Sequence, residues 1–170
     1  IGANISDYLI KPVKPNQILL CLKKNLETKK LVSERTSHAY QQEFRQIGMD
    51  ITNDLDYVEW VDIYRRLVYW ELELEKSTDT GMNEVLKMQK DEANQVFSKF
   101  IEKNYINWLR GSDIEKPVQS HTIIKERLFP ELNKEKPVFL ILIDNFRYDQ
   151  WKVLQPLIEE YFRIESDEVY

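Results

Sequence analysis

The chain has 170 residues, of which 42% are hydrophobic and 31% charged, with a formal net charge of −5 at pH 7. It is too apolar to stay disordered, and its acidic balance argues against nonspecific nucleic-acid binding, which needs an excess of Lys and Arg. A single cysteine, Cys21, excludes an internal disulfide and suits a reducing compartment. The longest apolar run, 138–143, is too short to span a bilayer.

Residues 1–30 predict a short strand followed by a helix. Ser6–Ile10 reads as the strand, and Pro12 ends it because proline lacks a backbone donor and fixes φ. Pro15 suits the first turn of a helix. From residue 16 to about 44 an amphipathic helix is expected, on the helical spacing of Ile18, Leu19, Leu22 and Leu26.

The middle of the chain predicts two more long helices. Asp54 is the expected cap of a helix that reaches about Lys76. A third helix follows over 82–108, and Gly111 is placed to end it. Together with the first helix, these segments predict an antiparallel helical bundle.

The last part of the chain predicts strands again. The unbroken apolar run 137–143 is typical of a strand buried on both faces of a sheet. A helix over 151–161 and a second strand over 162–170 are expected after it. The predicted fold class is therefore α/β fragments flanking an all-α middle, with domains at 1–30, 31–130 and 131–170.

The stretch 7–13, DYLIKPV, with the helix after it, resembles the end of bacterial receiver domains. The resemblance implies that Lys11 senses a phosphoryl group, that Tyr8 is the aromatic residue that changes rotamer, and that Pro12 follows a cis peptide bond. It also implies Mg²⁺ bound by ligands upstream of Ile1, since the acidic pocket is not in this stretch. The alternative for Lys11 is an ordinary solvated lysine.

The stretch 138–151, VFLILIDNFRYDQW, resembles the opening of PglZ domains of the alkaline phosphatase superfamily. There the aspartate at the end of the strand is a metal ligand, typically to zinc, so Asp144 inherits that role and Asn145 and Arg147 lie near the site. No catalytic residue is expected within the chain, because the nucleophile would follow Tyr170. The alternative for Asp144 is a helix N-cap.

The order of these parts resembles response regulators with a PglZ effector, which are linked to type IX secretion. That resemblance implies a cytoplasmic protein, phosphorylation by a sensor histidine kinase, and homodimers after phosphorylation. It implies a zinc-dependent hydrolase of phosphate esters or oligonucleotides in a longer protein, with this piece alone inactive. A sigma factor is a further candidate partner, and no membrane contact is expected. The alternative is a non-enzymatic adaptor controlled by the phosphorelay and acting through protein–protein contacts.

Overall fold

The computed structural model describes residues 9, 11 and 13 and the ranges 15–77, 80–111, 115–132 and 137–169. These residues form helices α1 (Pro15–Ile51), α2 (Tyr57–Glu75) and α3 (Thr80–Leu109), the π-helical turn η1 (Ile124–Leu128), and helices α4 (Phe129–Leu132) and α5 (Tyr148–Glu159). None of the described helices is long and apolar enough to cross a lipid bilayer.

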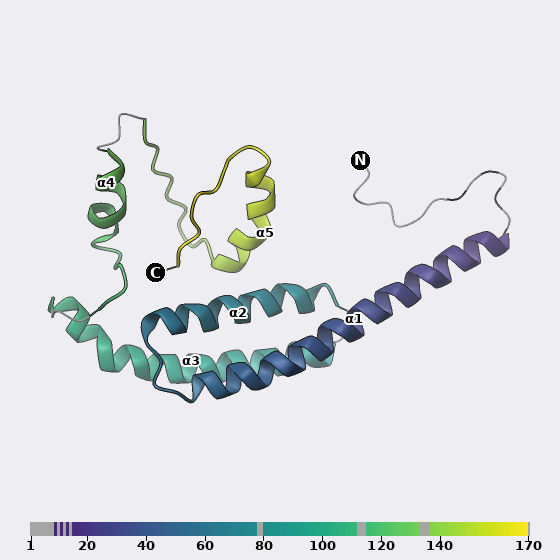
Figure 1. Cartoon of the computed structure of the whole chain (residues 1–170), viewed down its shortest axis with the longest axis horizontal. Coiled ribbons are helices and arrows are strands. Elements are labelled where there is room, and N and C mark those ends of the chain that lie inside the picture. The colour runs from purple at the N-terminus through teal and green to yellow at the C-terminus, as the bar shows by residue number, and fades with distance from the viewer. Residues whose placement is uncertain are drawn as a thin grey trace.

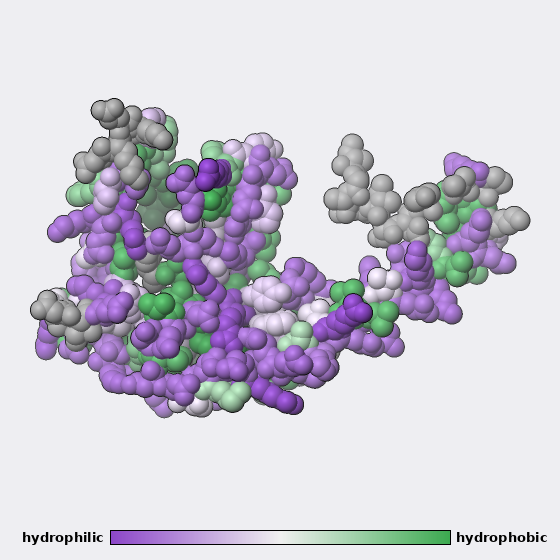
Figure 2. All heavy atoms as spheres, in the orientation of Figure 1, coloured by the Kyte–Doolittle hydropathy of each residue, from purple (hydrophilic) through white to green (hydrophobic). Residues whose placement is uncertain are grey.

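Helices α1, α2 and α3 form an antiparallel bundle in which each helix contacts the other two (Figure 1). The N-terminal half of α1 extends well beyond the bundle, and the first buried residue on this helix is Ser33. Apolar side chains alternate with hydrophilic ones along that projecting part (Figure 2). Leu26 is typical, since 67% of its surface stays exposed.

One continuous core holds the bundle together. Each helix contributes residues at helical spacing, so the same face stays buried along its length. The buried residues of this core are Tyr40, Ile47 and Ile51 of α1, Trp60, Ile63, Leu67 and Leu74 of α2, and Leu86 and Ala93 of α3. Burying a large apolar side chain contributes roughly 1.5–3 kcal/mol, so this cluster is the main source of bundle stability.

A buried amide fixes the relative positions of α1 and α3. Gln89, only 1% exposed, accepts a hydrogen bond from the Tyr40 hydroxyl at 3.0 Å and donates one to the Phe44 carbonyl oxygen at 2.8 Å. Burial raises the pKa of the Tyr40 hydroxyl above its usual value, so it remains a donor throughout the physiological range. Sliding α1 along α3 would break both bonds inside the core.

An arginine joins α2 to α1 on the polar side of the bundle. The Arg66 guanidinium donates through Nε to Glu43 at 2.6 Å and through Nη1 to Asp50 at 2.7 Å. Hydrogen bonding to Arg66 lowers the pKa of Asp50 against the opposing effect of partial burial. Ionised Asp50 therefore stabilises the fold at pH values above the pKa of an aspartate in the unfolded chain. This contribution is lost as the pH falls through the lowered pKa of Asp50 in the folded protein.

Most predicted helices are confirmed, with corrections at their ends. Pro15 is the first residue of α1, which continues to Ile51 rather than ending near Phe44. The cap of α2 is Asp56, so the prediction of Asp54 is wrong. The Asp56 carboxylate accepts a hydrogen bond from the Glu59 backbone N–H, and the Glu59 carboxylate accepts one from the Asp56 backbone N–H, both at 2.8 Å. Gly111 follows α3 with φ of 70°, as expected of a residue that ends a helix.

The predicted α/β parts at the two ends are wrong, because the residues that the structure describes contain no strand, and their regular elements are all helices. The predicted strand Ser6–Ile10 lies outside the described residues except for Leu9, which is not in a strand. Residues 137–143 and 162–169 are irregular, and Leu142 is 89% exposed. An apolar run becomes a buried strand only beside pairing strands, and no described segment pairs with it.

The buried Tyr40–Gln89 pair gives a direct test of the core. Tyr40→Phe should lower the free energy of unfolding by about 1–3 kcal/mol, because it leaves the buried Gln89 oxygen without its donor. Urea unfolding followed by circular dichroism measures this change.

Tyr69→Phe is the matched control, since Tyr69 is 55% exposed on α2 and its replacement should change stability by less than about 0.5 kcal/mol. Equal effects of the two substitutions would show that the buried hydrogen bond contributes nothing measurable.

Candidate functional site

The candidate site is the junction at which α2 holds the C-terminal segment. Helix α5 packs on the outer side of α2, away from α1 and α3 (Figure 1). Arg65 of α2 donates through Nη2 to the backbone oxygen of Asp167 at 2.6 Å. Residues 102 positions apart in the sequence are therefore joined, and the bundle is tied to the chain that follows α5.

The Asp167 carboxylate is the centre of this junction. It accepts a hydrogen bond from the Trp151 indole Nε1 at 3.2 Å and forms an ion pair with the Lys152 ammonium, both on α5. Burial opposes ionisation, yet the Lys152 ammonium and the Trp151 donor hold the pKa of Asp167 below its usual value. The side chain therefore anchors α5 while its backbone anchors α2.

Aromatic rings complete the contact between α2 and α5. The rings of Tyr64 and Tyr148 lie 5.8 Å apart, and the Lys152 ammonium lies 5.2 Å from the centre of the Tyr148 ring. On the other side, Arg127 of η1 pairs with Glu168 at 3.0 Å. Segment 162–169 thus contacts three helical elements through adjacent residues.

Several polar side chains at this junction pair with one another, but one arginine is only partly satisfied. The Arg65 Nε atom is buried without a hydrogen-bond partner, so this guanidinium is held mainly by its bond to Asp167. Among the described residues no group of three or more His, Cys, Asp or Glu side chains lies close enough to hold a metal ion. The geometry of the junction suits the positioning of one segment against another.

The receiver-type residues are described only in part. Lys11 is exposed and lies at a bend before the start of α1. Tyr8 and Pro12 lie outside the described residues. The phosphoryl-sensing role of Lys11, Tyr8 and Pro12 therefore stays a prediction.

Asp144 lies in an exposed turn before α5. Its carboxylate accepts the backbone N–H of Asn145 at 3.0 Å, and Asn145 has φ of 56°. The N-cap of α5 is Arg147, so the alternative interpretation of Asp144 as the cap is wrong. Arg147 pairs with Asp149 at 2.6 Å. A metal-binding role for Asp144 stays a prediction.

These described residues define a small antiparallel bundle with one projecting helix and one helix docked on its outer face. Residues 30–109 match the family model described as the PorX response regulator linker domain. The match begins close to Ser33, where α1 enters the core, and ends at the last residue of α3. This part of the chain is therefore similar to the linker of a response regulator. A search of curated proteins found no match.

The Asp167 junction gives a prediction about local stability. Asp167→Asn should weaken the ion pair with Lys152 and loosen α5, while the bundle core keeps its protection. We expect amide hydrogen exchange within α5 to be roughly fivefold to thirtyfold faster, the equivalent of about 1–2 kcal/mol. Mass spectrometry of peptides from α5 and from α3 measures the two regions separately.

Asp149→Asn is the matched control, because Asp149 is another ion-paired aspartate, but it lies within α5 itself and its partner is Arg147. If exchange in α5 is unchanged by Asp167→Asn, or rises equally in the control, the carboxylate of Asp167 does not anchor the helix.

Proposed function

We propose that this chain is the signal-transmitting part of a response regulator, in which the bundle couples a receiver domain to a PglZ-type effector. The observation that carries the proposal is the match of residues 30–109 to the linker domain of a response regulator. Two features support it: Lys11 is exposed four residues before the start of α1, and α1 runs unbroken from Pro15 into the core.

The proposed route of coupling follows the elements in contact. Helix α1 has 37 residues, and at 1.5 Å per residue it spans about 55 Å. A displacement at its N-terminal end is carried into the core, because Tyr40 and Ile47 are fully buried there. Helix α2 packs on α1 and holds Asp167 through Arg65. A change in α1 would thus bias how firmly the C-terminal segment is held.

The proposed partners follow from the regulator class. A sensor histidine kinase would phosphorylate a Mg²⁺-containing receiver domain, and phosphorylation would favour a homodimer in the cytoplasm. The proposed effector hydrolyses phosphate esters, including oligonucleotide phosphodiesters, in signalling linked to type IX secretion. Asp144 would supply one zinc ligand from its exposed turn, with further ligands from elsewhere in a longer protein. The metal would bind at Oδ2, which accepts only a 3.4 Å hydrogen bond from the Asn145 side-chain amide.

A second candidate function is a non-enzymatic adaptor. The observation that favours it is the exposed apolar surface of the chain, both on the projecting part of α1 and along residues 138–143 (Figure 2). Exposed apolar surface of this extent is typical of sites that bind other proteins. A sigma factor is a candidate partner for such an adaptor.

The receiver part of the proposal is tested at Lys11. In the full-length protein, Lys11→Ala should abolish the shift from monomer to dimer that acetyl phosphate produces, because the phosphoryl group loses its cationic partner. Light scattering coupled to size exclusion measures the shift.

The matched control is Lys29→Ala, which removes an exposed lysine of α1 and should leave dimerisation intact. A normal shift in the Lys11 variant would remove that lysine from the switch.

The effector part is tested at Asp144. In the full-length protein, Asp144→Ala should reduce bound zinc and lower the hydrolysis of bis(p-nitrophenyl) phosphate by at least about a hundredfold, since a metal that stabilises developing charge supplies several kcal/mol. Metal analysis and absorbance at neutral pH provide the two measurements.

Glu160→Ala, at the exposed end of α5, is the control and should retain both properties. Full zinc content and full activity after Asp144→Ala would exclude this residue as a ligand. A wild-type protein with neither zinc nor activity would favour the adaptor.

A further inference from the structure

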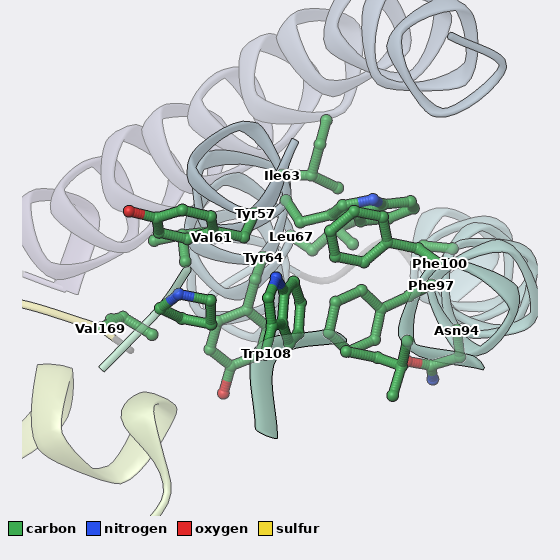
Figure 3. A pocket seen from close by; sticks show the side chains of 14 residues that line it. Tyr57, Val61, Ile63, Tyr64, Leu67, Asn94, Phe97, Phe100, Trp108 and Val169 are labelled. Atoms are coloured by element: carbon green, nitrogen blue, oxygen red, sulfur yellow. The ribbon is translucent and has the colours of Figure 1, made fainter. Parts of the chain in front are cut away.

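An aromatic cavity of about 410 Å³ lies between α2 and α3, on the side facing the C-terminal segment (Figure 3). It adjoins the Asp167 junction, with which it shares Tyr64, and Val169 lies at its edge. Six aromatic side chains dominate its wall: Tyr57, Trp60, Tyr64, Phe97, Phe100 and Trp108.

The aromatic wall is held in place by contacts among its own rings. The Phe97 ring lies 5.3 Å from the Trp60 ring and stacks at 6.0 Å on Phe100, which in turn meets Trp108 edge-on at 5.7 Å. Trp60 and Trp108 are buried, so their rings cannot swing into solvent. The wall is therefore preorganised, and a ligand would not have to order these side chains on binding.

The size of the cavity distinguishes it from ordinary packing between helices. Protein interiors contain few voids larger than a water molecule, whereas sites for small molecules occupy about 300–1,000 Å³. Phe97 remains 38% exposed at the rim, which gives the cavity an opening to solvent. The volume thus lies within the range of a ligand site.

The chemistry of the wall limits what can bind. None of the described residues that line the cavity is charged. The polar groups of these residues are the Asn94 amide, the hydroxyls of Tyr57 and Tyr64, and the indole N–H groups of Trp60 and Trp108. A charged ligand would lose its hydration without gaining an ion pair, whereas an aromatic ring would gain stacking and edge contacts. The favoured ligand is uncharged, aromatic and small.

We propose that this cavity is a binding site for a small uncharged aromatic molecule. The site goes beyond the proposed linker function, because it gives the bundle a ligand of its own. Pro117 and Val169 line it together with α2 and α3, so a bound molecule contacts the bundle and the C-terminal segment at once. Binding therefore strengthens the attachment of segment 162–169 to α2.

The test uses the chain of 170 residues and the neutral fluorescent probe N-phenyl-1-naphthylamine. We expect saturable binding with one probe per chain. The sulfonated analogue 1-anilinonaphthalene-8-sulfonate should bind at least about tenfold more weakly, because its charge has no partner in the wall. Absence of saturable binding, or a preference for the sulfonate, would overturn the proposal.

Two variants locate the probe. Ala93→Leu places extra volume in the cavity and should weaken binding at least about tenfold, whereas Met88→Leu, at an exposed position of the same helix, should have no effect. Phe97→Leu tests the site at its rim, where the fold tolerates change better; loss of one ring contact should weaken binding about threefold to tenfold.

Binding to the exposed apolar run is tested by Ile141→Lys. This substitution should leave the affinity unchanged, because residue 141 is not part of the cavity wall. If Ile141→Lys weakens binding and the two cavity variants do not, the probe binds the exposed segment and the cavity proposal fails. Failure here leaves the proposed linker function untouched, since that function is tested at Lys11 and Asp144.

Discussion

The packing of α2 between two different partners is the constraint on which the described structure depends. One side of the helix places Trp60, Ile63 and Leu67 in the core with α1 and α3. The other side presents Tyr64 and Arg65 to the C-terminal segment. Because neighbouring positions on one helix serve both contacts, α2 cannot rotate to improve one without weakening the other. Any movement of the bundle that turns α2 must therefore change the contact between Arg65 and Asp167.

The bundle could be predicted well from the sequence, because the signals that indicate each helix lie within or next to that helix. Apolar residues at helical spacing indicate α1, α2 and α3, and Pro15 and Gly111 mark a start and an end through their restricted or permissive φ angles. The errors at helix ends were also local. Ile47 and Ile51 continue the spacing of α1 beyond Phe44, and the Asp56–Glu59 spacing is the capping-box signal that Asp54 lacks.

The parts that could not be predicted depend on contacts between distant segments. Nothing in the sequence near Arg65 points to Asp167, because a hydrogen bond to a backbone oxygen leaves no residue signature on the acceptor. The run 138–143 illustrates the opposite error. Its composition predicts burial on two sides, but burial requires neighbours, and in the described part of the chain these residues remain exposed. The composition of a segment shows that it is apolar enough to be buried, but it does not show whether another segment lies beside it to bury it.

The two contacts of α2 also differ in the physical origin of their stability. The core side buries large apolar side chains over several helical turns, and the contributions of these side chains add up without depending on any ionised group. The Asp167 side depends on a few polar bonds around one carboxylate, each contributing about 0.5–3 kcal/mol net. Segment 162–169 and α5 should therefore open at a lower free energy than the bundle. A linker built in this way combines two properties. The bundle stays folded, while the weaker contact at Asp167 can open or close in response to a signal.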